Sequence, residues 1–361
     1  MRKLSFKASV VMSCLLASSV MSAAPKAKNV ILLIGDGMGI TQIFGTMTEA
    51  EKPMTFMQFP YTGICITSSA NAYVTDSAAS GTAIACGEKT DNGMIGQLPD
   101  GTDVASIRQE LAEEGLATGV VATSTITHAT PAAFVGHQPK RSMEEELAAD
   151  FVTYQPDVFI GGGRKYFEQR KDGRNLTNEL KALGYDVQSD IEGVEASKSD
   201  KLCGLLENEA LPAIITDGEN RKSLRGDILP RAAEKAIEVL SRDKDGFFLM
   251  IEGSQIDWAG HGNDSERVVA ETIDFDQAIA KALAFAEKDG ETLVLVTADH
   301  ETGGLTLVGG SREEHSIDVH FSTKNHTATP VMIFAYGPGA EKFSGIMENT
   351  EIKERIEAAM K

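Results

Sequence analysis

The sequence predicts an α/β fold, a three-layer sandwich in which helices cover both faces of a large, mostly parallel central sheet. Short apolar runs bounded by glycine or polar residues alternate along the chain with longer amphipathic stretches. Apolar runs that lack alternation are typical of strands buried on both faces. With 361 residues, of which 42% are hydrophobic, the chain is long enough to bury such a core.

The individual elements follow from these patterns. In chain order, strands are expected at residues 29–34, 119–122, 158–160, 247–251, 292–297 and 331–335. Helices between them are expected at residues 104–114, 143–149, 231–240 and 266–286. Residues 164–229 are more polar and less periodic, which predicts a peripheral excursion. Because no stretch resembles a linker, we expect a single domain over residues 25–361.

Residues 1–24 have the pattern of a secretory signal peptide. Basic residues precede an apolar stretch at residues 8–20, and small residues follow it. This stretch is too short to span a membrane. We expect cleavage between Ser22 and Ala24 and a periplasmic or secreted protein. Lipid attachment at Cys14 is the alternative, although the apolar run before that cysteine is short.

Charge and cysteine content narrow the class of protein. With 53 acidic and 34 basic residues, the net charge of −19 argues against nucleic acid or an anionic membrane as the main partner. A small-molecule substrate is the better hypothesis. After the leader only Cys65, Cys86 and Cys203 remain, so at most one disulfide could form. Three buried free thiols are the favoured interpretation.

Acidic residues and histidines follow three of the expected strands, where ligands bind in parallel sheets. Asp36 lies between two glycines, a pattern that a simple turn also uses. Asp257 and His261 are four residues apart, so a helical turn would bring both onto one metal. A loop carboxylate and a surface histidine are the alternative there. The adjacent Asp299 and His300 precede a glycine pair and are hard to explain by packing.

Together these residues predict a site for one or more divalent cations. Mixed oxygen and nitrogen ligands favour zinc at the histidine-bearing positions. His326 also lies at an element boundary, just before the strand at residues 331–335. His137, His315 and His320 have no such setting, and we expect them on the surface.

Ser77 is the candidate nucleophile. Residues 75–83 read Thr-Asp-Ser-Ala-Ala-Ser-Gly-Thr-Ala, which predicts a closely packed helix that begins near Ser77. The positive end of a helix dipole favours an alkoxide modestly, and a metal bound to the oxygen does so far more strongly. An ordinary N-cap serine is the alternative.

Five motifs, in family order, resemble those of the bacterial alkaline phosphatases. They are Gly-Asp-Gly-Met-Gly at 35–39, the run at 75–83, His-Ala-Thr-Pro-Ala-Ala at 128–133, Glu-Gly-Ser-Gln-Ile-Asp at 252–257 and Thr-Ala-Asp-His-Glu-Thr-Gly-Gly at 297–304. The resemblance implies that family's fold. It also implies hydrolysis of phosphate monoesters to an alcohol and inorganic phosphate at alkaline pH, through a phosphoserine intermediate.

The resemblance further implies a site for three metal ions. The first zinc would be bound by Asp257, His261 and His326. The second zinc, which also holds the Ser77 oxygen, would be bound by Asp36, Asp299 and His300. A magnesium ion would share Asp36 and take Thr130 and Glu252. Arg141 corresponds to the arginine that binds phosphate, and Asp76 would orient it. Residues 142–145 read as a capping box, which places Arg141 just before a helix.

His128 and Trp258 depart from the best-known enterobacterial pattern, which has Asp and Lys at these positions. We expect both side chains to border the magnesium site and the phosphate. Phosphate would then bind less tightly, and the third cation would bind more weakly or be replaced by zinc. Oxygen ligands still favour magnesium there. The alternative is that the two side chains merely pack over the site.

Two alternative functions and the expected binding partners also follow from the sequence. A phosphodiesterase or sulfatase of the same superfamily is the runner-up, but Arg141 and the third-site ligands favour a doubly charged monoester. An inactive zinc- or phosphate-binding protein is disfavoured by Ser77. Expected partners are phosphomonoesters and inorganic phosphate. Members of the family are commonly homodimers, and the short connection at residues 310–325 predicts that any insertion clasping a second copy is small.

Overall fold

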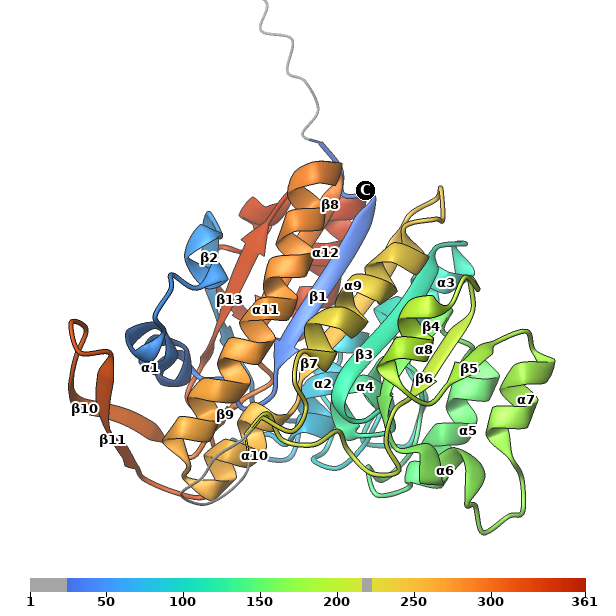
Figure 1. Ribbon diagram of the computed structural model, residues 1–361, viewed down its shortest axis with the longest axis horizontal. Coiled ribbons are helices and arrows are strands. Elements are labelled where there is room, and N and C mark those ends of the chain that lie inside the picture. The colour runs from blue at the N-terminus through green and yellow to red at the C-terminus, as the bar shows by residue number, and fades with distance from the viewer. Residues whose placement is uncertain (1–24, 216–222) are drawn as a thin grey trace, which may run out of the picture.

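A twisted sheet runs through the middle of the computed structural model, which describes residues 25–215 and 223–361 (Figure 1). The leader expected at residues 1–24 lies outside these described residues. The strands of this sheet are Asn29–Gly35 (β1), Tyr61–Ile66 (β2), Ala117–Thr125 (β3), Val158–Gly162 (β4), Asp186–Gln188 (β5), Leu202–Leu205 (β6), Phe247–Gly253 (β7), Thr292–Thr297 (β8), Val331–Tyr336 (β13) and Gly345–Glu348 (β14).

The strand order in the described part of the chain is β14-β2-β13-β8-β1-β7-β3-β4-β6-β5. All neighbours pair in parallel except β13, which is antiparallel to both β2 and β8. Every residue of β1, β7 and β8 is buried, since helices cover both faces. In Figure 1, α9 (Ile228–Leu240) and α11 (Ser265–Asp289) cross the near face, and α12 (Glu351–Met360) lies behind the sheet. The predicted fold class is confirmed.

The remaining helices lie on the faces or beyond the carboxyl ends of the strands. They are α1 (Ile40–Glu49), α2 (Ser77–Cys86), α3 (Ile107–Glu113), α4 (Ala129–Ala133), α5 (Glu144–Tyr154), α6 (Arg164–Glu168), α7 (Leu176–Ala182), α8 (Ile191–Ala196) and α10 (Gln255–Gly262). Two small antiparallel pairs complete the structure: β9 (Glu301–Thr302) with β12 (His326–Thr327), and β10 (Leu305–Ser311) with β11 (Ser316–Phe321).

All six predicted strands are present, most of them longer than expected. The main correction concerns residues 164–229, which are not only an excursion, because they supply β5 and β6 to the edge of the sheet. The helix expected from residue 104 begins at Ile107, since the Ser106 hydroxyl accepts a hydrogen bond from the Gln109 backbone N–H and the Gln109 side chain accepts one from Ser106.

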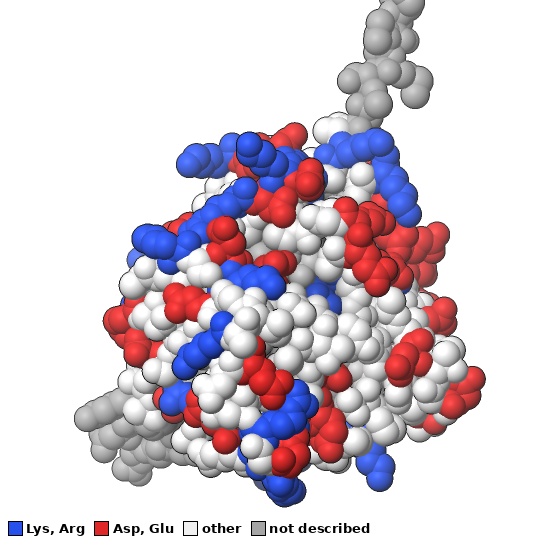
Figure 2. Space-filling model, turned by 90° about the vertical axis from the view of Figure 1, so that its right-hand side faces the viewer, with Lys and Arg blue, Asp and Glu red and all other residues white. Residues whose placement is uncertain are grey.

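The distribution of charged side chains and the state of the three cysteines can be compared with the expectations from composition. Acidic and basic side chains are interspersed over the face shown in Figure 2. Within the described ranges, no helix is both long enough and apolar enough to cross a membrane. Cys65, Cys86 and Cys203 are buried and unpaired, as the favoured interpretation predicted. Burial raises the pKa of the Cys65 and Cys86 thiols to about 12.

Candidate active site

The sheet register brings the candidate residues together at the carboxyl ends of the central strands. Ile34 of β1 lies opposite Glu252 of β7 and Thr297 of β8. Asp36 and Asp299 each follow two residues after this row. Because the three strands are parallel neighbours, their carboxylates meet at one edge of the sheet.

Asp36, Asp299 and His300 form a cluster that we call the buried group. All three are completely buried, and one ligand atom from each lies within 4.8 Å of the others. His300 Nε2 is 3.1 Å from Asp299 Oδ2 and 3.5 Å from Asp36 Oδ1. Burial, followed by the negative charge of Asp299, raises the pKa of Asp36 well above its usual range.

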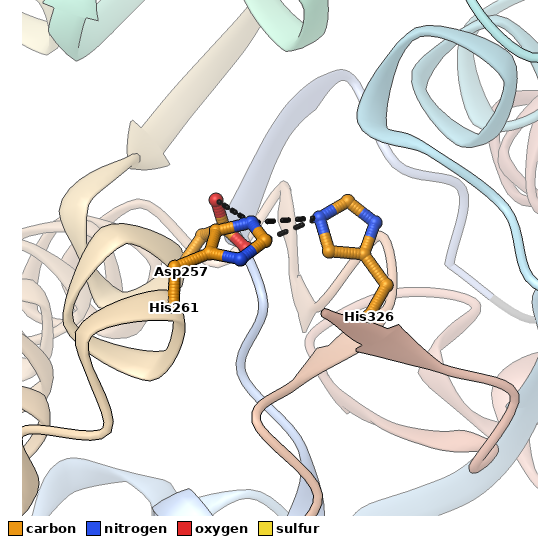
Figure 3. Close-up of side chains that lie close together, drawn as sticks. All are labelled: Asp257, His261 and His326. Atoms are coloured by element: carbon orange, nitrogen blue, oxygen red, sulfur yellow. Dashed lines mark hydrogen bonds and ion pairs between the residues drawn. The ribbon is translucent and has the colours of Figure 1, made fainter. Parts of the chain in front are cut away.

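Asp257, His261 and His326 form a second cluster, which we call the rim group (Figure 3). Asp257 and His261 project from one turn of α10, so the helical spacing that the sequence required is present. The Nε2 atoms of the two histidines are 3.2 Å apart, and each lies 3.4 Å from an Asp257 oxygen.

Backbone carbonyls fix the orientation of both histidines in the rim group. His261 Nδ1 contacts the carbonyl oxygen of Lys324, and His326 Nδ1 contacts that of Thr75. A carbonyl only accepts, so both Nδ1 atoms donate and a neutral ring presents its Nε2 lone pair to the other histidine and to Asp257. A cation between these atoms would satisfy all of them.

A third cluster joins Asp36 to Glu252 and a ring nitrogen of His128, again within 4.8 Å. Ser254 and Ser124 donate hydrogen bonds to Glu252 Oε2, at 2.5 and 3.3 Å. Burial raises the pKa of Glu252 to about 7. The Trp258 ring lies edge-on to His128, a member of this cluster, with ring centres 6.1 Å apart.

Several buried oxygens at these clusters receive no hydrogen bond from the part of the chain that the structure describes. They are Asp36 Oδ1 and Oδ2, Thr130 Oγ1, Glu252 Oε1 and Asp299 Oδ2. Leaving such atoms uncompensated is costly in a protein interior. Carboxylates with imidazoles fit zinc, and the oxygen-rich set around Asp36, Thr130 and Glu252 fits a harder cation. The residues present therefore fit divalent cations.

Ser77 is the first residue of α2 and faces the buried group. Asp76, not Ser77, is the N-cap, because its carboxylate accepts a hydrogen bond from the Ala79 N–H at 3.0 Å. The N-cap interpretation of Ser77 is thus wrong. Ser77 Oγ lies 3.2 Å from His300 Nε2.

The Arg141 side chain extends from the loop before α5 toward Asp76 and His128. Its Nη1 pairs with Asp76 Oδ2 at 3.1 Å, and its Nη2 donates to His128 Nε2 at 3.2 Å. Its guanidinium is therefore held close to the residue that precedes Ser77. Burial, followed by the positive charge of Arg141, lowers the pKa of His128 to about 4.

Two sequence predictions near this loop are wrong. Residues 142–145 form no capping box: Met143 is the N-cap, without a side-chain hydrogen bond, and Ser142 is exposed. His137 is partly buried, because its ring contacts the Gly96 carbonyl and the Gln109 side chain. His315 and His320 are exposed, as expected.

Sequence reasoning missed two residues that hold the candidate ligands and their strands in place. The Thr302 hydroxyl donates to Asp257 Oδ1 at 2.5 Å. The buried Glu301 carboxylate accepts from the side chains of Gln42 and Thr327 and from the N–H groups of Gly304 and Leu305, which ties β9 to β12. Both residues belong to a motif noted above, but spacing alone does not indicate their partners.

Comparisons with known proteins agree with this geometry. A family model described as alkaline phosphatase matches residues 27–317 and 310–361. Alkaline phosphatase 4 of Bacillus subtilis is 33% identical over 90% of this chain and 87% of its own. The Escherichia coli alkaline phosphatase is 32% identical over 92% of this chain and 86% of its own.

Solved structures show the same likeness. Alkaline phosphatase from the Antarctic bacterium TAB5 has a TM-score of 0.86 and 45% identity, covering 93% of this chain and 98% of that chain. A mutant of the TAB5 enzyme with magnesium bound in its M3 site also has a TM-score of 0.86, with 43% identity, covering 93% of this chain and 99% of that one.

Proposed function

The chain belongs to the alkaline phosphatase family, and on that premise we propose which of its residues hydrolyse phosphate monoesters. The enzyme is a metal-dependent phosphatase that releases an alcohol and inorganic phosphate. Phosphomonoester hydrolysis is favoured over the phosphodiesterase or sulfatase alternative. The observation that carries the assignment of roles is the position of Ser77 Oγ, 3.2 Å from His300 Nε2 in the buried group.

The proposed ligands follow the three clusters. The rim group and the buried group would each hold one zinc ion, and Asp36, Thr130 and Glu252 would hold magnesium with His128 at the border. When bound, these cations act as Lewis acids that favour the ionised Ser77 hydroxyl and offset the charge of the phosphate. The oxygen donors of Asp36, Thr130 and Glu252 support magnesium at the third position.

Ser77 carries out the first chemical step. Its oxygen attacks phosphorus in line, a bond from Ser77 Oγ to phosphorus forms, and the bond from phosphorus to the alcohol oxygen breaks. A water molecule then attacks the phosphoserine on the opposite side, which releases inorganic phosphate and restores Ser77. The N-terminus of α2, where Ser77 lies, favours the negative charge in both steps.

Arg141 binds the phosphate during both steps. Its planar guanidinium can donate two parallel hydrogen bonds to non-bridging oxygens. The ion pair with Asp76 holds this fork beside the nucleophile. Asp76 therefore has two roles, since its other oxygen caps α2.

Two measurements test this proposal: the relative rates on a phosphate monoester and a diester, and the site of covalent phosphate labelling. With zinc and magnesium supplied, we expect p-nitrophenyl phosphate to be hydrolysed much faster than bis-p-nitrophenyl phosphate. Acid quenching during turnover should trap phosphate on the peptide that contains Ser77. Label on another residue, or preference for the diester, would contradict the assignment.

A homodimer exported from the cytoplasm is the second part of the proposal. Ile40 and Phe44 of α1 are 47% and 48% exposed, and Val308 of the adjoining β10 is 65% exposed. Such an apolar surface is typical of a contact with another chain. The signal-peptide pattern supports export to the periplasm or medium. Sedimentation of the Phe44→Glu variant and mass analysis of the mature N-terminus test these two points separately.

A further inference from the structure

Glu144, the first residue of α5, connects two segments of the site. Its Oε2 accepts hydrogen bonds from the hydroxyls of Thr125 and Thr127, both at 2.9 Å. Its Oε1 accepts a hydrogen bond from the Tyr166 hydroxyl at 2.8 Å. Hydrogen bonds to a carboxylate are stronger than those between neutral groups. The Glu144 carboxylate therefore makes its contacts outside its own helix.

The first of the two segments is the turn that follows β3. Thr125 ends β3, Thr127 lies in the turn, and His128 is the N-cap of α4. This segment also contacts the third cluster, because the Ser124 hydroxyl bonds to both the Thr125 carbonyl and Glu252.

The second segment carries Arg141, three residues before Glu144. The Arg141 backbone N–H donates to the Gly93 carbonyl at 2.7 Å, and its side chain is 30% exposed. A long, partly exposed side chain has many rotamers, so the orientation of its guanidinium depends on how its backbone and its partners are placed. Glu144 fixes the start of α5 against the turn that presents His128, which is also a partner of the Arg141 guanidinium.

We propose that Glu144 is a positioning residue, which holds the Arg141 guanidinium in the orientation that binds phosphate. This inference rests on the proposed role of Arg141 as the phosphate ligand. Glu145 and Glu146 also lie in the first turn of α5 and interact equally well with its dipole. What distinguishes Glu144 is its set of hydroxyl partners on β3, the following turn and α6.

The experiment measures binding of inorganic phosphate to the metal-loaded enzyme by titration calorimetry. Glu144→Ala should weaken binding roughly tenfold, a size typical of coupled neighbours. Glu144→Gln retains one acceptor oxygen and should recover part of the loss. The matched control is Glu146→Ala, which removes an exposed carboxylate from the same helical turn and should leave binding unchanged. Elemental analysis should give the same metal content for all variants.

The decisive measurement is a double-mutant cycle with Arg141→Ala. If Glu144 acts through Arg141, Glu144→Ala should change phosphate affinity less than about twofold in the Arg141→Ala background. An equal loss in both backgrounds would overturn the inference while leaving the role of Arg141 intact. If Arg141→Ala alone leaves phosphate affinity unchanged, the proposed function of Arg141 fails instead.

Milder variants keep the test usable if Glu144→Ala does not fold. Tyr166→Phe and Thr127→Val each remove one hydroxyl donor and nearly preserve side-chain shape. Each should weaken phosphate binding by a smaller factor, and this loss should disappear when Arg141 is absent. Unchanged phosphate affinity in a folded protein that carries both substitutions would also overturn the inference.

Discussion

The buried group and the rim group contain the same kinds of side chain in opposite settings. Asp36, Asp299 and His300 are fully buried and follow the ends of central strands. The side chains of His261 and His326, in contrast, are 39% and 15% exposed and belong to α10 and to the two-residue strand β12. The central sheet thus positions the buried group, which lies next to Ser77. Peripheral elements position the rim group, which solvent can reach.

The two groups are nevertheless in contact. The rings of His300 and His326 are stacked, with centres 3.5 Å apart and an angle of 21° between their planes. Thr302 adds a second connection, because its hydroxyl bonds to Asp257 and lies 3.3 Å from His300 Nδ1. A substitution in the buried group should therefore alter the geometry of the rim group, and the reverse, although the two groups differ in exposure to solvent.

The largest expected effect tests whether the buried group serves a nucleophile. Ser77→Ala should lower turnover of p-nitrophenyl phosphate at least about a thousandfold, because the covalent step is lost. Zinc content should remain close to that of the unmodified enzyme, since carboxylates and imidazoles provide the other ligands. The exposed Ser142→Ala is the control and should retain full turnover. Near-normal turnover of Ser77→Ala would refute the assignment.

Chelation tests the difference in exposure directly. We expect EDTA to remove metal in two phases, with the ion at the rim group leaving first, because solvent reaches His261 but not the buried group. His261→Ala should abolish the fast phase and leave the slow one. Metal content and turnover measured on the same quenched samples provide the check. A single phase that removes all metal together would show that exposure does not separate the groups.

Protonation of the buried Glu252 should have a smaller effect, on stability and on cation binding. Burial raises the pKa of Glu252 to about 7, compared with 4.5 for an ordinary glutamate. Between pH 4.5 and about 7, Glu252 is protonated in the native metal-free protein but ionised in the unfolded chain. The contribution of Glu252 to the free energy of unfolding therefore falls as pH rises through this range.

A cation at this position needs the ionised carboxylate. Magnesium binding at about pH 6 should therefore release a proton from Glu252, and binding at about pH 8.5 should not. Calorimetry in two buffers of different ionisation enthalpy measures the number of protons released. Glu252→Gln should show no such release at either pH. Equal proton release by the unmodified enzyme at both pH values would contradict the raised pKa.

The smallest effect concerns the border of the third cluster. The double substitution His128→Asp with Trp258→Lys adds a carboxylate near Glu252 and a positive charge near the phosphate. We expect tighter inhibition by phosphate, by a few-fold, and a stronger dependence of turnover on magnesium. His315→Asp, on the exposed surface, is the control. If neither property changes, His128 and Trp258 only pack over the site.

The candidate ligands Asp36 and Asp299 could be placed together from sequence because strand ends have simple rules. Asp36 and Asp299 directly follow apolar runs, and the predicted parallel arrangement is enough to bring them together. Arg141 and Thr130 needed the resemblance to a family, since nothing in their local pattern separates them from ordinary loop and helix residues. The same rules predicted the central strands but not β5 or β14, which are short edge strands with few fully buried residues.

The residues that support the ligands were not predictable, for a physical reason. The partners of Glu301 include Gln42, about 260 residues earlier in the chain, and Tyr166 reaches Glu144 from a different helix. Such contacts depend on how distant segments pack and on side-chain direction, neither of which is encoded in local periodicity. Glu145 shows the limit of local reasoning, because its spacing from Ser142 predicted a capping box that does not form.

The position of β1 in the sheet has a consequence for the order in which the protein is assembled. This strand comes first in the described chain, yet both of its neighbours, β7 and β8, lie more than 200 residues later. During synthesis the backbone N–H and C=O groups of β1 therefore stay without their strand partners until most of the chain has been made. Contacts of such long sequence separation slow folding. A nascent chain that ends before residue 292 lacks β8, so it leaves one edge of β1 open to association with other chains.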